Sequence, residues 1–231
     1  MRIKPMGGGT VKLVLFDLDG TLVDTAPDLG LALNIQRQRH ALPALEMAAI
    51  RPFASHGSRG LLGVGFGLQP SDDRFEAMRE EYLALYDQVF AESSTLFEGM
   101  DQVLTALQQR GLPWGVVTNK PRRFAAPLMQ ALQLDRSAAC LVCADDAVRA
   151  KPDPETLYMA CRQVGVAARD AIYVGDAERD IQAGKAAGMR TVLAAYGYIA
   201  STDSPQAWAA DTQVETPLDL LSLLPLSAST A

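Results

Sequence analysis

The sequence predicts an α/β protein, a doubly wound parallel sheet with an inserted α-helical subdomain. From about residue 95 onward, short apolar runs rich in Val, Leu and Ile alternate with helix-like stretches. Such runs are typical of parallel strands that are covered on both faces. Residues 26–92 instead show helical periodicity without a strand candidate, which is too long a stretch for a crossover connection.

The predicted strands each end in polar or small residues. Because parallel strands present their carboxyl ends at one edge of a sheet, where such folds bind ligands, we expect these residues to converge. Helix-like stretches such as MDQVLTALQQRG and PETLYMACRQVG lie between the strands and end at glycine, as helices commonly do. The strand candidates are KLVLF before Asp17, WGVV before Thr118, CLVCA before Asp145, AIYV before Gly175 and RTVLAAY before Gly197.

The helical stretch divides the chain into two parts. We expect residues 1–23 and 96–231 to form the α/β core and residues 24–95 to form a helical insertion. Its position directly after the first strand favours a lid over the ligand-binding edge, and an additional helical layer is the alternative. Asp24 and Thr25 precede the first helical run and are expected to cap it.

Composition and charge limit the classes of function. The formal net charge of -6 and a pI near 5.0 provide no overall field that favours nucleic acid or an anionic membrane. The apolar runs are far shorter than the roughly 20 residues of a membrane span. The N-terminal MRIKPMGGG is basic, but the following apolar run stops at Asp17 before a secretory signal forms. We expect a cytoplasmic monomer or homodimer with no nucleic-acid or membrane partner.

The three cysteines leave one thiol without a partner, which argues against a disulfide framework. Cys140 and Cys143 stand three positions apart in an apolar run, so on a strand they point to opposite faces. No second pair completes a zinc site. We expect Cys140, Cys143 and Cys161 to be buried structural thiols.

Two carboxylates one residue apart, Asp17 and Asp19, follow the first predicted strand. Like charges this close repel each other, and the apolar strand places them at the rim of a core. On the predicted sheet Asp176 follows a neighbouring strand, so the three carboxylates need a cation or shared protons. Ligands that are all oxygen select a hard ion, most simply Mg²⁺, which also takes phosphate oxygens. The pattern therefore predicts magnesium-assisted phosphoryl chemistry.

Four motifs in order resemble those of the haloacid dehalogenase-like hydrolases. They are DLDGT at 17–21, VVTN at 116–119, KPDP at 151–154 and GDAERD at 175–180. The resemblance covers nearly the whole chain, with residues 26–92 in the place of the family's helical cap. It implies the family's Rossmann-like core and an α-helical cap inserted after the first motif.

The resemblance implies a role for each carboxylate. Asp17 would be the nucleophile that forms an aspartyl-phosphate. Asp19 would be the general acid that protonates the leaving alcohol and then the base that activates water. Mg²⁺ would be bound by the side chains of Asp17 and Asp176 and by the backbone carbonyl of Asp19.

Roles for the phosphate-binding residues follow from the same resemblance. Thr118 and the backbone of Asn119 would hydrogen-bond the phosphoryl oxygens, and Lys151 would balance the charge of aspartate and phosphate. Asp180 would support the metal indirectly or hold Lys151. Lys120 also precedes a proline. The motif order favours Lys151 as the catalytic lysine and leaves Lys120 at the site entrance.

The aspartate at position 19 separates the chain from the family's dehalogenases, which lack this carboxylate. We expect hydrolysis of a small phosphomonoester, although a sugar-phosphate phosphatase or a β-phosphoglucomutase-like mutase would keep the same motifs. The stretch ASHGSRG at 54–60 lies where family caps insert a specificity loop. This implies substrate contacts from Arg59, His56 and Ser58, with Arg59 on a carboxylate, and a solvated turn is the alternative.

As a whole the chain resembles the phosphoglycolate phosphatase branch of the family. Several stretches are similar to the bacterial N-acetylmuramic acid 6-phosphate phosphatases of cell-wall recycling. Both N-acetylmuramic acid 6-phosphate and 2-phosphoglycolate carry a phosphomonoester and a carboxylate, so Arg59 suits either, and the resemblance favours the former. The stretches are FEGM at 97–100, WGVVTNKP at 114–121, KPDPE at 151–155, YGYI at 196–199 and W-x-A-D at 208–211.

Overall fold

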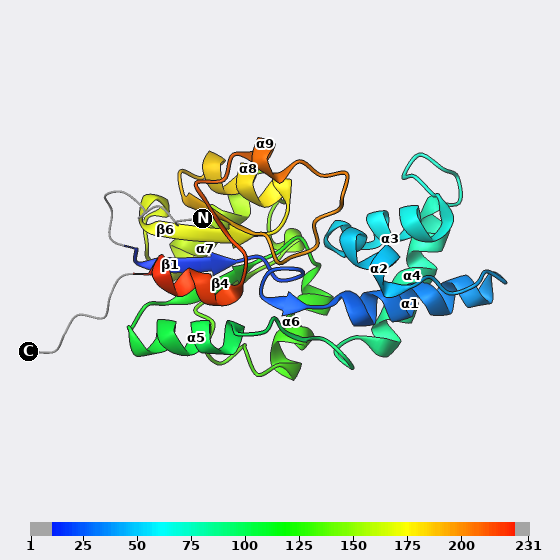
Figure 1. The fold of residues 1–231 in the computed structure, drawn as a ribbon, viewed down its shortest axis with the longest axis horizontal. Helices are drawn as coiled ribbons and strands as arrows, with labels where there is room; N and C mark the ends of the chain where they lie inside the picture. The colour runs from blue at the N-terminus through cyan, green and yellow to red at the C-terminus, as the bar shows by residue number, and fades with distance from the viewer. Residues whose placement is uncertain (1–10, 225–231) are drawn as a thin grey trace, which may run out of the picture.

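The computed structural model describes residues 11–224, so the basic N-terminal stretch and the end of the C-terminal tail lie outside the described residues. Within this range, the main sheet has six parallel strands in the order β5-β4-β1-β6-β7-β8 (Figure 1). The predicted doubly wound α/β fold is confirmed. The strands are β1 Leu13–Phe16, β4 Trp114–Val117, β5 Leu141–Val142, β6 Ala171–Gly175, β7 Arg190–Ala194 and β8 Thr212–Val214.

Helices connect these strands and lie on both sides of the sheet (Figure 1). The α-helices of the core are α5 Met100–Gln109, α6 Arg122–Ala131, α7 Glu155–Val164, α8 Glu178–Ala186 and α9 Pro205–Trp208. The 3-10 helices of the core are η2 Ala144–Asp146, η3 Ala168–Asp170 and η4 Pro217–Ser222.

Successive apolar side chains of the central strand β1 point to opposite faces of the sheet, and both faces are covered by other elements. Val14 and Phe16 belong to a buried cluster that also contains side chains of α5, α6 and η4. Leu13 and Leu15 point to the other face and pack with side chains of α7 and α8. The continuous apolar run therefore places the end of β1, and Asp17 after it, at the rim of two packed layers.

An insertion whose residues 26–89 contain helices and no strand lies between β1 and α5. Its helices pack around a further buried cluster that includes Leu33, Tyr82 and Tyr86. A small antiparallel sheet of β2 Val23–Asp24 and β3 Thr95–Leu96 lies where the insertion leaves and rejoins the core. The helices are α1 Ala26–Arg39, α2 Met47–Ile50, the 3-10 helix η1 Arg51–His56, α3 Gly57–Phe66 and α4 Phe75–Val89.

Two predicted strands are shorter than their apolar runs. In CLVCA only Leu141–Val142 is a strand, and β7 ends at Ala194 instead of continuing toward Gly197. The edge strand β8 was not predicted, because three residues of alternating polarity carry little pattern. The cysteines Cys140, Cys143 and Cys161 are buried and free, as predicted.

The prediction that Asp24 and Thr25 cap the first helix was wrong. Thr25 stands at the N-cap position of α1, but its side chain makes no capping hydrogen bond. Its hydroxyl instead donates to Asp19 Oδ1 at 2.6 Å. Asp24 pairs with Arg51 of η1, with 2.9 Å between Nη2 and Oδ2. Both side chains thus serve tertiary contacts near the sheet edge.

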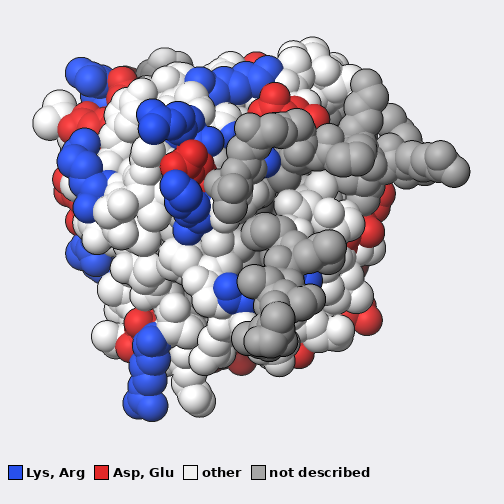
Figure 2. Space-filling model, turned by 90° about the vertical axis from the view of Figure 1, so that its left-hand side faces the viewer, with Lys and Arg blue, Asp and Glu red and all other residues white. Residues whose placement is uncertain are grey.

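The surface opposite the helical insertion carries charges of both signs. Figure 2 shows Lys and Arg side chains interspersed with Asp and Glu side chains on this end of the molecule. Within residues 11–224, no helix combines the length and the apolar character that crossing a membrane requires.

Candidate active site

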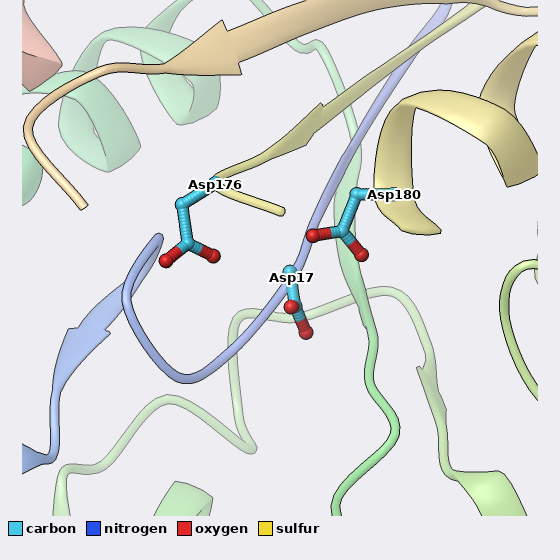
Figure 3. Close-up of side chains that lie close together, drawn as sticks. All are labelled: Asp17, Asp176 and Asp180. Carbon is cyan, nitrogen blue, oxygen red and sulfur yellow. The ribbon is translucent and has the colours of Figure 1, made fainter. Parts of the chain in front are cut away.

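The carboxyl ends of β1 and β6 bring acidic side chains together. Asp17 follows β1, Asp176 follows the neighbouring strand β6, and Asp180 lies in the first turn of α8 (Figure 3). All three are buried, and one carboxylate oxygen from each lies within 4.8 Å of the others. This arrangement concentrates negative charge at the rim of the core.

The ammonium of Lys151 lies inside this cluster. Its Nζ is 3.0 Å from Asp17 Oδ1 and 2.7 Å from Asp180 Oδ1. It also lies 2.6 Å from the Tyr173 hydroxyl and 3.0 Å from the Val117 carbonyl oxygen. The side chain has no exposed surface, so these oxygens replace the water it loses. Of the two lysines that precede proline, Lys151 is the one beside Asp17.

Lys120 holds the other carboxylate of the DLD sequence. Its Nζ lies 2.9 Å from Asp19 Oδ1, and only 7% of its side chain is exposed. The same nitrogen lies 4.8 Å from the centre of the Tyr86 ring on α4, a cation–π distance. Thr25 donates to the same oxygen of Asp19. The sequence placed Lys120 only at the entrance of the site. In the structure it forms an ion pair with Asp19.

Thr118 and Asn119 follow β4 and approach the KPDP loop. The buried Thr118 accepts a hydrogen bond at Oγ1 from the Lys120 backbone N–H at 3.0 Å. Asn119 Nδ2 donates to the Lys151 carbonyl at 2.9 Å, and its Oδ1 accepts from the Lys151 N–H at 3.1 Å. Sequence reasoning considered only the backbone of Asn119 and missed this contact of its side chain.

Burial and crowding change the acidity of the carboxylates. Burial raises the pKa of Asp17 to about 6, and the negative charge of Asp180 adds to the effect despite Lys151. Burial, then Asp180 and Asp17, raises the pKa of Asp176 to about 7. Burial also acts to raise the pKa of Asp180, but Lys151 and Arg179 hold it below its usual value. The site without a metal ion therefore favours the protonated forms of Asp17 and Asp176 more than water does.

The donor set fits a hard divalent cation. The predicted ligands were the side chains of Asp17 and Asp176 and the backbone carbonyl of Asp19. The hydroxyl of Ser55, from η1, lies 2.6 Å from Asp176 Oδ2 and 3.4 Å from Asp19 O. Because the Ser55 hydroxyl contacts both Asp176 Oδ2 and the Asp19 carbonyl oxygen, these two oxygens face the same small space. Oxygen ligands only, together with raised carboxylate pKa values, fit Mg²⁺.

Sequence reasoning also missed Arg179 of α8. Its Nη2 donates to the Ser55 carbonyl at 2.8 Å and lies 3.8 Å from Asp17 Oδ2. Ser55 and Arg179 both lie inside stretches that the sequence singled out, ASHGSRG and GDAERD. Nothing in the spacing of those stretches indicates that the two residues meet.

A pocket of about 880 Å³ opens between the sheet edge and the helical insertion. Its wall includes the predicted substrate-binding residues His56, Ser58 and Arg59. Partial burial, and then the positive charge of Arg179, lowers the pKa of His56. Lys151 is not among the described residues that line the pocket, because it is buried behind Asp17. Other lining residues include Asp17, Asp19, Arg79, Tyr82, Tyr86, Thr118, Asn119, Lys120, Arg123 and Arg179.

A comparison with protein families identifies the architecture. The family model described as haloacid dehalogenase-like hydrolase matches residues 14–194, which include all four motifs. The chain belongs to this family. The family prediction made from the motifs is confirmed, and the chain is a hydrolase.

Individual relatives match nearly the whole chain. The N-acetylmuramic acid 6-phosphate phosphatase of Pseudomonas putida is 43% identical over 214 residues, 93% of this chain and 96% of that protein. The phosphoglycolate phosphatase of Xanthomonas campestris is 41% identical over 209 residues, 90% of this chain and 94% of that protein. Both of these relatives of the present haloacid dehalogenase-like hydrolase are named as phosphatases.

Solved structures match the fold. A crystal structure of a predicted phosphoglycolate phosphatase from Haemophilus somnus has a TM-score of 0.80 at 26% identity, over 94% of this chain and 99% of that chain. A structure from Lactobacillus delbrueckii has a TM-score of 0.82 at 24% identity, over 94% of this chain and 100% of that chain, and shows likeness of fold alone.

Proposed function

We propose that this hydrolase is a Mg²⁺-dependent phosphomonoesterase that acts through an aspartyl-phosphate on Asp17. The observation that carries the proposal is the ammonium of Lys151, 3.0 Å from Asp17 Oδ1, within a buried carboxylate cluster of which Asp17 lines the pocket. A carboxylate that is held in place and partly neutralised is suited to attack phosphorus. Burial and the charge of Asp180 raise the pKa of Asp17 despite Lys151, so a bound cation would further stabilise its charged form.

In the first step Asp17 attacks phosphorus, and the bond between phosphorus and the leaving alcohol oxygen breaks. Asp19 donates a proton to that oxygen, and in the second step it takes a proton from the water that hydrolyses the aspartyl-phosphate. Bound by Asp17, Asp176 and the Asp19 carbonyl, Mg²⁺ would supply positive charge to the phosphoryl oxygens. Lys151 keeps Asp17 in place from the side that faces away from the pocket.

Two groups around Asp19 control its position. Lys120 and Thr25 both bind Oδ1 of Asp19, at 2.9 Å and 2.6 Å. This leaves Oδ2 as the oxygen that carries the proton to the leaving group. Thr118 already accepts from the Lys120 N–H, and its own hydroxyl proton is suited to a phosphoryl oxygen.

We propose that residues 24–95 act as a cap on the core formed by residues 1–23 and 96–231. The two-stranded sheet of β2 and β3 then provides the hinge. The pocket between core and insertion supports this reading over an additional helical layer, because its wall combines Asp17 and Asp19 with residues of η1, α3 and α4. Closure would exclude water from the reacting phosphate.

We favour N-acetylmuramic acid 6-phosphate as the substrate. The pocket of about 880 Å³ lies in the range of sites for ligands of tens of atoms, whereas 2-phosphoglycolate would fill only a small part of it. The 43% identity with the Pseudomonas putida enzyme supports the same choice. Exposed Arg59 on the wall is suited to the substrate carboxylate. The 41% identity with the Xanthomonas campestris enzyme keeps 2-phosphoglycolate as the second candidate.

A phosphatase screen with MgCl₂ tests the proposal. It compares release of phosphate from N-acetylmuramic acid 6-phosphate, 2-phosphoglycolate and hexose phosphates by kcat/KM. We expect the muramic acid phosphate to rank first and Asp17→Asn to abolish turnover. A clear preference for hexose phosphates would contradict both carboxylate-bearing substrates. Interconversion of sugar phosphates without phosphate release would replace the phosphatase by a mutase.

A further inference from the structure

We propose that Arg179 binds the phosphoryl group at Asp17 and links it to the helical insertion through the backbone carbonyl of Ser55. The proposal rests on the proposed phosphatase function and adds a residue to it. Two features of the structure support it: the position of the guanidinium relative to Asp17, and its buried Nε, which has no hydrogen-bond partner among the described residues 11–224.

Arg179 is the cation of the GDAERD stretch that faces the pocket. Its side chain is 20% exposed and lines the wall, whereas Lys151 is fully buried behind Asp17. The two cations also address different oxygens, since Lys151 binds Oδ1 of Asp17 and Arg179 lies 3.8 Å from Oδ2. A phosphate entering from the pocket therefore meets Arg179 before Lys151.

The guanidinium of Arg179 can donate further hydrogen bonds. The 3.8 Å separation from Asp17 Oδ2 is longer than a hydrogen bond. Within residues 11–224, the Nε of Arg179 is buried without a hydrogen-bond partner. A buried donor without an acceptor is unfavourable, and an Arg fork matches two oxygens of a phosphate. A phosphoryl group beside Asp17 would supply the missing acceptors.

The same guanidinium is bonded to the helical insertion. Its Nη2 donates at 2.8 Å to the carbonyl of Ser55 in η1, a residue 124 positions away in the chain. A phosphate that fixes the guanidinium therefore also fixes its contact with η1. The Ser55 hydroxyl makes separate contacts with Asp176 and the Asp19 carbonyl, so the contacts of its side chain can be removed without removing its carbonyl.

Calorimetric binding of inorganic phosphate in the presence of MgCl₂ tests the first part. We expect Arg179→Gln to weaken binding by about tenfold or more and Arg179→Lys to weaken it less, because a charge-assisted pair is lost or only impaired. Arg149→Gln is the matched control, since that guanidinium is 68% exposed and paired with Asp153 outside the pocket. Unchanged affinity in a folded Arg179→Gln protein would overturn the proposal.

Hydrogen–deuterium exchange of residues 51–56 tests the link, at phosphate concentrations that saturate each variant. We expect phosphate to increase protection in the wild type and in Ser55→Ala, which keeps the backbone carbonyl, but not in Arg179→Gln. Equal added protection in Arg179→Gln would overturn the link. A wild-type protein that hydrolyses no phosphomonoester and binds no phosphate would overturn the proposed function itself, which distinguishes the two failures.

Discussion

The carboxamide of Asn119 pairs with both backbone groups of Lys151. Its Nδ2 donates to the lysine carbonyl at 2.9 Å, and its Oδ1 accepts from the lysine N–H at 3.1 Å. The loop that carries the lysine is therefore aligned with the end of β4, where Thr118 also lies. This contact connects the second and third motifs of the site before any ligand binds.

Replacing Asn119 by Ala should lower kcat by about 10- to 100-fold, because small displacements of charged groups near the reacting atoms have effects of this size. Steady-state kinetics on the best substrate measures the change, and KM should change less than kcat. Asn34→Ala is a matched control. Asn34 makes the same two bonds with the backbone of Leu45, at 2.9 Å and 2.8 Å, in the helical insertion. Equal losses of kcat in both variants would contradict the assignment.

Replacing Lys151 by Met should affect both activity and stability. The substitution leaves Asp17 and Asp180 without their shared cation, and breaking such a buried pair costs about 3–5 kcal/mol of unfolding free energy. We expect kcat/KM to fall by at least ~100-fold. Urea unfolding and steady-state kinetics measure the two effects.

Lys120→Met tests which lysine supports the nucleophile. Lys120 contacts Asp19 and the Tyr86 ring, so its loss should impair proton transfer but leave Asp17 held. The fall in kcat/KM should be smaller than for Lys151→Met. A larger fall for Lys120→Met than for Lys151→Met would reverse the assignment.

The metal-free protein should lose stability as pH rises from about 4 to 7. Asp17 and Asp176 have folded pKa values of about 6 and about 7, above the ordinary aspartate value of 3.8, so in this window the folded state binds more protons than the unfolded state. The free energy of unfolding therefore decreases with pH. Mg²⁺ should raise the melting temperature more at about pH 8 than at about pH 5, because it binds the charged carboxylates.

Thermal unfolding with and without MgCl₂ measures this effect. Asp176→Asn should remove most of the Mg²⁺-dependent increase, because it removes one of the expected ligands. An increase that is equal at both pH values, or that survives this substitution, would contradict a metal site at these carboxylates.

Gly20→Ala should weaken Mg²⁺ binding. Gly20 has φ of +83°, and a Cβ there would meet the carboxylate of Asp176. Gly111→Ala is the control, since Gly111 has φ of +61° but a Cβ there would meet open space. Backbone strain should cost each variant about 1–2 kcal/mol of stability, and Gly20→Ala should lose more because its Cβ overlaps Asp176. Only the first should reduce Mg²⁺ affinity in calorimetry, and equal affinities would contradict the prediction.

Local patterns were sufficient to predict the sheet and the acidic residues at its edge. Asp17 and Asp176 each follow an apolar run that the alternation with helices identifies as a strand, and parallel neighbours bring the ends of such runs together. Short edge strands such as β8 were missed, because three residues do not define a periodicity.

Contacts that depend on tertiary placement could not be predicted. Arg179 meets Ser55 only because η1 rests on the sheet edge, and no local pattern determines how the insertion sits. Tyr173 was read as part of an apolar strand, yet its hydroxyl lies 2.6 Å from Lys151 Nζ. Thr25 was expected to cap a helix and instead binds Asp19. In each case a polar side-chain atom bonds a residue from another element, and the local sequence does not show which one.

The central claim is that Asp17 carries the phosphoryl group during turnover. Borohydride reduces an aspartyl-phosphate to homoserine, so quenching the reaction, reducing it and sequencing the peptides by mass spectrometry locates the modified residue. With p-nitrophenyl phosphate, whose leaving group needs no proton from Asp19, the Asp19→Asn variant should increase the yield of homoserine, because water is then activated poorly. The account predicts homoserine at position 17, only with both phosphomonoester and Mg²⁺ present. An unmodified Asp17 in a protein that is turning over substrate, or modification at Asp19 or Asp176 instead, would contradict it.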